Sequence, residues 1–449
     1  MYSKFRKAAF RAASSVLIAI VLTTRIFSPL SISTAGNNAP TAHAASVVDK
    51  KKDDHTYRIV AVGDSLTAGY EYGFTEQSIP YGFVEHVYEQ ALFHGLRAEY
   101  INYGVLGLRT SGLNRWIDAV VSGVSVKSSD IQSGLPDPRA ERIFAETSLL
   151  RSALSEADLI VMTIGGNDLY AVLDKLNKGA DHAETIAVLD KALDTYETEL
   201  EPALRLLLSQ QPNAQIIIAD QYLPIPPPLK VGSLIFPLYP EADRLFLKDS
   251  IKQLRERLNQ IIDRLVKEGF NVKIANVSSS FIDNELSYTS IAKGDIHPSR
   301  AGYAAMGKSF SKAIWGDYRV VKPRAKDSES ALAIVINGKE MISANKPMVV
   351  QNRTFVPLRS IVDALGATIN WNAAAQTATI KVADRAVDLT VGQSSFRENG
   401  TVKTLNAPPA FIHTVGKAST LYVPLAALSE GLQFQVIYRD TLKTVFINK

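Results

Sequence analysis

Short apolar runs that end in glycine or polar residues alternate with longer amphipathic stretches over residues 57–317. Such runs are typical of buried strands, and apolar positions three or four residues apart predict helices that pack on a sheet. The predicted strands are residues 59–62, 97–103, 157–164, 215–220 and 271–277, the predicted helices are 81–94, 109–121, 183–209, 241–268 and 299–315, and a polar loop is predicted at 122–138. Strands separated by crossover helices favour a parallel sheet covered on both faces. We therefore expect an α/β domain, a three-layer α/β/α sandwich, over residues 57–317.

One pattern occurs twice in residues 331–449. Phe355-Val356-Pro357-Leu358 recurs as Tyr422-Val423-Pro424-Leu425, and the apolar positions that follow also correspond. Each copy predicts a strand, a short helix and a two-stranded hairpin, and repeated units generally bury their faces against each other. We expect a smaller α+β module of two repeats, joined to the α/β domain by a basic, polar linker over residues 318–330.

Residues 1–44 have the pattern of an export signal. Basic residues up to Arg11 precede an apolar stretch from Val16 to Leu22, and small residues surround a cleavage point at Ala42-His43-Ala44. Arg25 ends the apolar stretch well short of the roughly 20 residues that a membrane span needs. An uncleaved anchor is the alternative. In both cases we expect the remainder to be secreted or associated with the cell wall, with residues 45–56 as a linker and no membrane span after signal cleavage.

Composition narrows the classes of function. The 49 basic residues nearly balance the 45 acidic ones and leave a formal charge of +4, which is not the pattern of a nucleic-acid-binding protein. The chain has no cysteine, which excludes disulfides and thiolate metal sites. No motif requires a cofactor or a metal ion.

Residues suited to acyl transfer follow the predicted strands. Ser65 comes directly after the first strand, where open α/β sheets bind their ligands. A hydroxyl group there is a candidate nucleophile if a base takes its proton and hydrogen-bond donors receive the oxyanion. The alternative is that Gly63-Asp64-Ser65 only turns the strand into a helix, with Asp64 or Ser65 as the N-cap.

Candidate partners for Ser65 occur further along the chain. His297 is the candidate base, and Asp295 is the candidate acid that orients its ring. The N–H groups of Ser65 and Gly104 and the amide of Asn167 are the candidate oxyanion donors, because glycine permits close approach and an amide is a fixed, uncharged donor. A helix cap at Asn167, and simple turn residues at Gly104 and His297, are the alternatives.

Four motifs resemble, in order, the four sequence blocks of the SGNH (GDSL-type) hydrolases. They are Gly63-Asp64-Ser65-Leu66, Asn102-Tyr103-Gly104, Gly165-Gly166-Asn167-Asp168 and Asp295-Ile296-His297-Pro298. The resemblance extends from about Arg58 to Trp315 and implies a flavodoxin-like α/β/α sandwich with esterase, lipase, thioesterase or carbohydrate deacetylase activity. By position, Ser65 is similar to the family's nucleophile, Gly104 and Asn167 to its oxyanion donors, and His297 to its base.

The fourth block departs from the family pattern, in which two residues separate the acid from the histidine. Here Gly294 takes the acid's usual place, and Asp295 lies one residue closer to His297. A shift of one residue moves a carboxylate by about 3.5 Å along an extended chain. Asp295 therefore reaches the ring only if the loop bends, which Gly294 permits, and Asp283 is the alternative acid.

Two further regions have candidate roles. The apolar, proline-rich segment 221–240 is a candidate lining or lid of an acyl pocket, or else a loop packed over the core. The repeat module resembles the copper amine oxidase N-terminal-like domain, which is often appended to exported bacterial proteins. With His413 as its only histidine it offers no copper site, which leaves a wall-associated accessory module or a spacer.

These features predict an exported serine hydrolase that cleaves carboxylic esters through an acyl-enzyme. The expected substrate is a small-molecule, lipid or acetylated glycan ester, and contact with the cell wall is expected through the C-terminal module. An O-acetyl esterase acting on carbohydrate or peptidoglycan is the first alternative. A non-catalytic wall-associated binding protein is the second.

Overall fold

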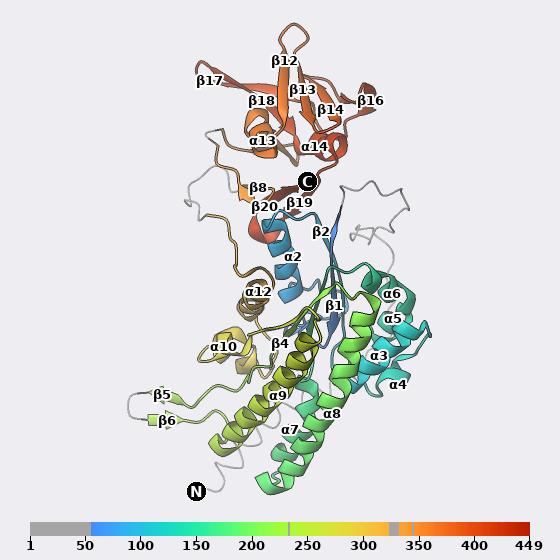
Figure 1. Ribbon diagram of the computed structural model, residues 1–449. Coiled ribbons are helices and arrows are strands. Elements are labelled where there is room, and N and C mark those ends of the chain that lie inside the picture. The colour runs from blue at the N-terminus through green and yellow to red at the C-terminus, as the bar shows by residue number, and fades with distance from the viewer. Residues whose placement is uncertain (1–54, 232–233, 323–331, 344) are drawn as a thin grey trace, which may run out of the picture. The chain divides into compact units, whose positions relative to one another are not determined.

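Figure 1 shows the computed structural model of the chain, which describes residues 55–449 except 232–233, 323–331 and 344. The described chain forms two compact units. The first contains the described residues up to Val87 together with Tyr100–Gly316, and the second contains Tyr88–Glu99 together with Asp317–Lys449. The predicted signal peptide and parts of both predicted linkers lie outside the described residues. The exact domain boundaries therefore stay predictions.

The first unit is built on the parallel sheet that the alternating pattern predicts. Its strands, in spatial order, are β2 (Ala98–Gly104), β1 (Tyr57–Gly63), β3 (Leu159–Thr163), β4 (Gln215–Ala219) and β7 (Val272–Ala275). The pairs β1–β3, β3–β4 and β4–β7 are parallel, and Gly63 at the end of β1 lies opposite Thr163 at the end of β3. The carboxyl ends of these strands therefore meet at one edge. Every residue of β3 is buried, which explains its unbroken apolar sequence.

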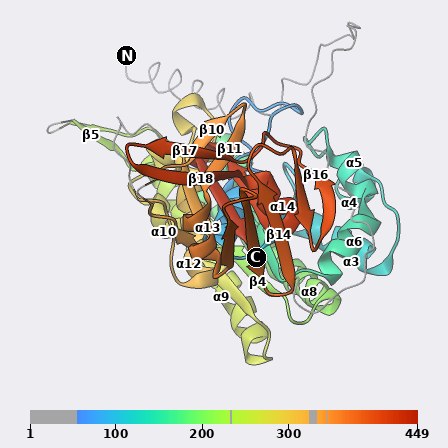
Figure 2. The same ribbon diagram turned by 90° about the horizontal axis from the view of Figure 1, so that it is seen from above.

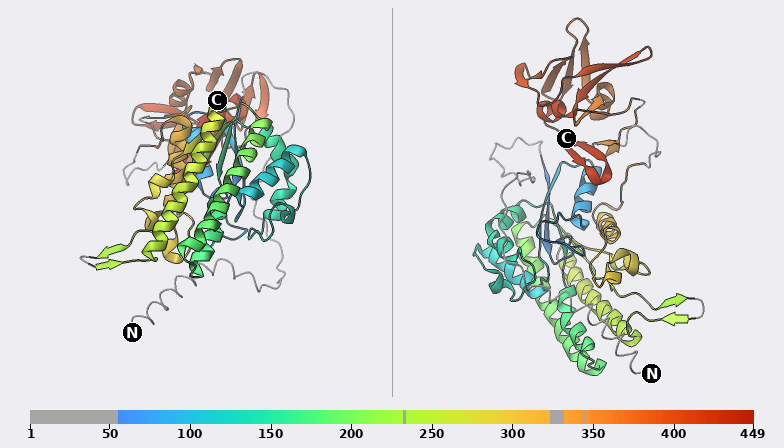
Figure 3. Two further views of the ribbon diagram at one scale, coloured as in Figure 1. Left: turned by 60° about the horizontal axis from the view of Figure 1, so that its bottom comes forward. Right: turned by 180° about the vertical axis from the view of Figure 1, so that it is seen from behind.

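Helices cover both faces of the sheet and complete the sandwich (Figures 1 and 3). Alternate strand residues such as Val60 and Met162 share one core with α3, α8 and α9, while α12 packs on β4 and β7. The main helices are α2 (Phe83–Phe93), α3 (Thr110–Ser122), α8 (His182–Gln210), α9 (Glu241–Lys267) and α12 (Arg300–Trp315). The shorter ones are α4 (Ser128–Ile131), α5 (Ala140–Ala145), α6 (Thr147–Ser155), η1 (Gly166–Leu169), α7 (Tyr170–Asn177), α10 (Ser278–Phe281), α11 (Glu285–Tyr288) and η2 (Ile291–Lys293). Helix α4 lies within the stretch predicted to be a loop.

The described residues contain no helix that is both long and apolar enough to cross a bilayer.

The apolar segment 221–240 divides into two parts. Its start is held against the first unit, because the Gln221 amide donates to the Ile164 carbonyl at 3.0 Å and Tyr222 is buried. Its later part forms a hairpin of β5 (Leu229–Val231) and β6 (Leu234–Phe236), which extends away from the helices in Figure 1. Ile235 and Phe236 on this hairpin are exposed. The segment is thus packed at its root and solvent-facing beyond it.

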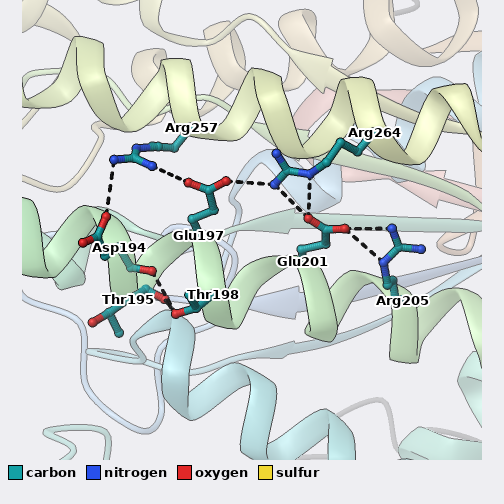
Figure 4. Close-up of polar contacts among 8 residues, drawn as sticks. All are labelled: Asp194, Thr195, Glu197, Thr198, Glu201, Arg205, Arg257 and Arg264. Carbon is teal, nitrogen blue, oxygen red and sulfur yellow. Dashed lines mark hydrogen bonds and ion pairs between the residues drawn. The ribbon is translucent and has the colours of Figure 1, made fainter.

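Helices α8 and α9 lie side by side in the same direction, and a ladder of ion pairs joins them (Figures 3 and 4). Arg257 contacts Asp194 and Glu197, and Arg264 contacts Glu197 at 3.0 Å and Glu201 at 2.8 Å. The pairs Asp194–Arg257 and Glu201–Arg264 are both separated by 63 residues, as two parallel helices in one register require. Because each glutamate is shared or doubly bonded, this is a network rather than a set of isolated pairs.

We expect Arg264→Met to lower the free energy of unfolding by about 1 kcal/mol, because it leaves two partly buried glutamates without their shared cation. Urea unfolding of the purified variant measures this change. The control is Lys252→Met on the same helix, which removes only the exposed pair with Glu256 and is expected to cost less than about 0.5 kcal/mol. Equal losses in the two variants would show that the network adds nothing.

The second unit contains the two predicted repeats (Figure 2). The first repeat runs through β11 (Arg353–Pro357), α13 (Leu358–Leu365), β12 (Thr368–Asn372) and β13 (Thr377–Val382), and the second through β18 (Ala418–Pro424), α14 (Leu425–Leu432), β19 (Gln435–Arg439) and β20 (Thr444–Asn448). Strands β11 and β18 pair antiparallel with Val356 opposite Val423. These two valines hold equivalent places in the repeats. An approximate local twofold axis between β11 and β18 therefore relates the two repeats.

The remaining strands of the second unit complete three sheets, one of which contains the β11–β18 pair. They are β8 (Ala333–Ile336), β9 (Lys339–Glu340), β10 (Met348–Val350), β14 (Arg385–Thr390), β15 (Ser395–Glu398), β16 (Thr401–Thr404) and β17 (Phe411–Val415), with a short η3 (Asp440–Leu442). The sheet orders are β10-β11-β18-β17, β12-β13-β14-β15-β16 and β19-β20-β8-β9. Apolar side chains from both repeats form one buried core. The strand-rich α+β module predicted from the repeat is confirmed.

The second unit also includes a segment from far earlier in the chain, Tyr88–Glu99. The Asn448 amide donates to the carbonyl oxygens of Leu92 and Leu96, at 3.1 and 2.8 Å. The Gln435 side chain accepts from the N–H of Ala98 and donates to its carbonyl. These contacts satisfy the main chain where α2 ends, so this segment is an integral part of the second unit.

Candidate active site

The turn that carries Ser65 is fixed by its neighbours at the end of β1. Gly63 has a φ of +139°, and a Cβ atom there would lie 2.2 Å from the Thr163 carbonyl oxygen, so only glycine fits. The buried Asp64 carboxylate accepts from the Thr163 hydroxyl at 2.6 Å and from the Leu66 N–H at 3.0 Å. Burial raises the pKa of Asp64 to about 6, although these hydrogen bonds oppose the rise. Asp64 therefore braces the turn and leaves Ser65 at its apex.

Ser65, His297 and Asp295 form one continuous chain of hydrogen bonds. The Ser65 Oγ lies 2.9 Å from His297 Nε2, and His297 Nδ1 lies 2.6 Å from Asp295 Oδ1. All three residues are at most 6% exposed. An ionised carboxylate only accepts hydrogen bonds, so the imidazole proton sits on Nδ1 and Nε2 is free to accept from the Ser65 hydroxyl.

The local turn explains how the Asp295 carboxylate reaches the His297 ring, although Asp295 is one residue closer to the histidine in sequence than the acid of the family pattern. Asp295 Oδ1 accepts from the His297 main-chain N–H at 2.8 Å as well as from the ring, which is an Asx turn. Gly294 makes the bend with a φ of +83°. Burial favours a higher pKa for Asp295, but the hydrogen bonds from His297 outweigh it and leave the pKa below its ordinary value. Asp283 is exposed, and the two ring nitrogens of His297 bond to Asp295 and Ser65 instead.

Asn167 and Asp168 connect the loop after β3 to the loop after β2. The Asn167 amide donates one hydrogen bond to the Leu108 carbonyl at 2.9 Å, which leaves its second N–H available. Asp168 accepts from the Thr110 N–H at 3.1 Å and from its hydroxyl at 2.9 Å, and so caps the start of α3. Burial raises the pKa of Asp168 to about 6. These bonds hold the Asn167 amide beside residues 107–108.

Gly104 does not have the free N–H group that the sequence analysis assigns to it. That N–H donates to the Asn102 side-chain oxygen at 2.9 Å. A Cβ atom at Gly104 would lie 2.1 Å from the Ala68 nitrogen, so glycine is needed for packing against the turn after Ser65. The Asn102 amide also donates to the Thr67 carbonyl at 2.7 Å. Gly104 and Asn102 therefore support the turn that carries Ser65, and the N–H of Gly104, which was the expected oxyanion donor, is bonded to Asn102 in this structure.

Gly107 is a second glycine in the loop after β2, and the sequence analysis did not single it out. The N–H groups of Val105, Leu106 and Leu108 donate to the Gly63 carbonyl, the Asp137 carboxylate and the Val105 carbonyl, respectively. Among the described residues the N–H groups of Gly107 and Ser65 have no acceptor. Gly107 precedes Leu108, whose carbonyl holds Asn167, and has a φ of +80°. The second glycine of Asn102-Tyr103-Gly104-Val105-Leu106-Gly107 was the available signal, but spacing alone did not distinguish it from Gly104.

Two family models match the chain. Residues 61–305 match the GDSL-like lipase/acylhydrolase family, and residues 335–447 match the copper amine oxidase N-terminal domain. The first match spans more than half of the 449 residues.

Several known proteins are similar to the chain. The uncharacterized protein YpmR of Bacillus subtilis (strain 168) is 22% identical over 44% of this chain and 69% of its own length. The lipase Lip_vut3 from a goat rumen metagenome is 18% identical, covering 57% of this chain and 96% of its own with a TM-score of 0.36. A catalytic mutant of Axe2, an acetylxylan esterase from Geobacillus stearothermophilus, is 17% identical, covering 60% and 97% with a TM-score of 0.35. By its family-model match, the chain belongs to the GDSL-like lipase/acylhydrolase family.

Proposed function

We propose that the protein is an exported serine esterase that hydrolyses carboxylic esters through an acyl-enzyme. The supporting observation is the continuous chain from Asp295 to His297 to Ser65, with steps of 2.6 and 2.9 Å. His297 Nε2 takes the hydroxyl proton as Ser65 Oγ attacks the ester carbon, and then gives that proton to the departing alcohol. Water attacks the acyl-enzyme in the same way and releases the acid. Asp295 holds the ring and stabilises its positive charge while the proton is on it.

In this proposal three donors receive the oxyanion that forms on the ester carbonyl. They are the N–H groups of Ser65 and Gly107 and the second amide N–H of Asn167. Each is uncharged and held by the surrounding fold, so it can stabilise charge that develops only in the transition state. Gly107 replaces Gly104 in this role because the Gly104 N–H is already bonded to Asn102.

We expect Asn167→Ala to lower kcat by a factor on the order of 10²–10³ with little change in KM, because one oxyanion donor is lost. Steady-state kinetics on a p-nitrophenyl ester measure both constants. The matched control is Asn213→Ala, at an exposed position, which is expected to behave as the wild type. An effect on KM alone would mean that Asn167 binds the substrate rather than the transition state.

The substrate class that we propose is a carboxylic ester with an apolar acyl group. The exposed apolar side chains of Phe236 and Leu238, on the segment that follows β4, support this class because they provide apolar surface that an acyl chain can contact. The test compares hydrolysis of p-nitrophenyl esters of increasing chain length with acetate release from acetylated xylan and acetylated peptidoglycan. A rate that rises with chain length supports the lipase or esterase class. Activity on the acetylated polymers alone would instead assign an O-acetyl esterase of carbohydrate or peptidoglycan.

The proposed location is outside the cytoplasm, secreted or associated with the cell wall. The basic, apolar and small-residue regions of residues 1–44 support export. N-terminal sequencing of the protein recovered from culture medium and from the wall fraction tests this location. Recovery of a full-length protein with membranes would favour the uncleaved anchor.

A further inference from the structure

Two buried tyrosines that take no part in the proposed chemistry donate hydrogen bonds around the catalytic histidine. The Tyr222 hydroxyl donates to the Ile296 carbonyl at 3.0 Å, and the Tyr303 hydroxyl donates to the Tyr70 carbonyl at 2.6 Å. Tyr222 is 7% exposed and Tyr303 is fully buried. Tyr222 comes from the segment after β4 and Tyr303 from α12. Both bonds join parts of the chain that are distant in sequence.

Tyr222 acts on the peptide group from which His297 extends. The carbonyl of Ile296 and the N–H of His297 belong to one planar peptide unit and point in opposite directions. Asp295 Oδ1 accepts from that N–H at 2.8 Å, while the Tyr222 hydroxyl holds the carbonyl on the other side. The peptide is thus held at both ends and cannot rotate without breaking a buried hydrogen bond. The Tyr222 ring is itself stacked on Phe281, with centroids 3.9 Å apart.

Tyr303 bonds to the main chain of Tyr70, the residue whose side chain packs against the imidazole ring. The Tyr70 ring lies 4.5 Å from the His297 ring between centroids, at an angle of 59°. The Tyr70 main chain is held on two sides, because its N–H donates to the Ser65 carbonyl at 3.0 Å and its carbonyl accepts from Tyr303. Tyr70 thereby connects the nucleophile turn to one face of the imidazole.

We propose that the hydroxyl groups of Tyr222 and Tyr303 are positioning groups for His297. They keep its Nε2 within hydrogen-bond reach of Ser65 Oγ while the proton moves to the ring and back. The short Asp295-Ile296-His297 turn gives this role its importance, since only Ile296 separates the acid from the base and a rotation of the peptide group between Ile296 and His297 moves the ring. This inference rests on the proposed serine mechanism.

The test compares Tyr222→Phe with Tyr422→Phe, a matched control. Tyr422 is also buried, also stacks on a phenylalanine and also donates its hydroxyl to a main-chain carbonyl, that of Lys346 at 2.9 Å, but it belongs to the second unit. We measure kcat and KM on a p-nitrophenyl ester, the rate at which a fluorophosphonate labels Ser65, and Tm. Tyr222→Phe is expected to lower kcat and the labelling rate by roughly 10- to 100-fold with KM within twofold, because a displaced base loses its geometry. Tyr422→Phe is expected to lower Tm by about as much as Tyr222→Phe does. It is expected to leave kcat and the labelling rate within twofold of the wild type.

Fluorophosphonate labelling separates this inference from the proposed function, because labelling needs the activated serine but no particular ester. A wild-type protein that is not labelled overturns the proposed function and the inference with it. A labelled wild type whose Tyr222→Phe and Tyr303→Phe variants react at the wild-type rate overturns the inference alone. Tyr303→Phe is expected to slow labelling as well, and it decides the question if Tyr222→Phe does not fold.

Discussion

Ser65→Ala should fold as the wild type does and lose ester hydrolysis by a factor on the order of 10⁴–10⁶ in kcat. The side chain of Ser65 makes one hydrogen bond, to His297, while the turn itself is held by Asp64 and Gly63. Removing the hydroxyl therefore removes the nucleophile and little of the structure. Steady-state kinetics and circular dichroism of the two proteins measure both effects.

The control for this prediction is Ser155→Ala, at an exposed serine at the end of α6, which is expected to retain full activity. Turnover near that of the wild type in a folded Ser65→Ala protein would contradict the serine mechanism. A wild-type protein without activity on any ester of the panel would favour the non-catalytic wall-associated protein.

Asp295→Asn should lower kcat by up to about 10⁴ with the fold intact. The amide is similar in shape to the carboxylate but can donate to His297 Nδ1, which would move the ring proton to Nε2 and leave no base facing Ser65. Hydrogen bonds from His297 hold the pKa of Asp295 below its ordinary value, so in the wild type this acid is ionised throughout the neutral pH range. The loss is therefore expected across the whole neutral pH range, and a pH–rate profile of kcat measures it.

Asp283→Asn provides the comparison, because Asp283 was the alternative acid in the sequence. It is exposed, with a φ of +63°, and is expected to retain wild-type activity. A large loss at Asp283 with none at Asp295 would reverse the assignment of the acid while leaving Ser65 and His297 in place.

The sequence predicted those features that depend on local pattern. The alternation of apolar runs and amphipathic stretches predicted the parallel sheet, and the sharp ends of those runs predicted which residues meet at its edge. Ser65, Asn167 and His297 were singled out in this way because each lies in a turn that follows a strand or precedes a helix. The repeat in the C-terminal region predicted its strand, helix and hairpin order.

The remaining features depend on geometry that a residue pattern does not contain. Whether Asp295 reaches His297 depends on an Asx turn and on the backbone of Gly294, and not on spacing alone. The choice between Gly104 and Gly107 depends on which N–H is already bonded, which requires the position of Asn102. The contact of Tyr222 with the histidine turn joins residues 74 positions apart and has no local signal.

The composition of the second unit has a consequence for the order in which the chain folds during synthesis. Leu96 bonds to Asn448, which the ribosome adds 352 residues later. At about 5–20 residues per second this delay is roughly 20–70 s. Throughout that time the end of α2 lacks the partners that satisfy its carbonyl groups, even though the strands on either side of it have already been made. The second unit is therefore expected to form last. A chain that lacks its final few residues should be cleaved by proteases within residues 88–99.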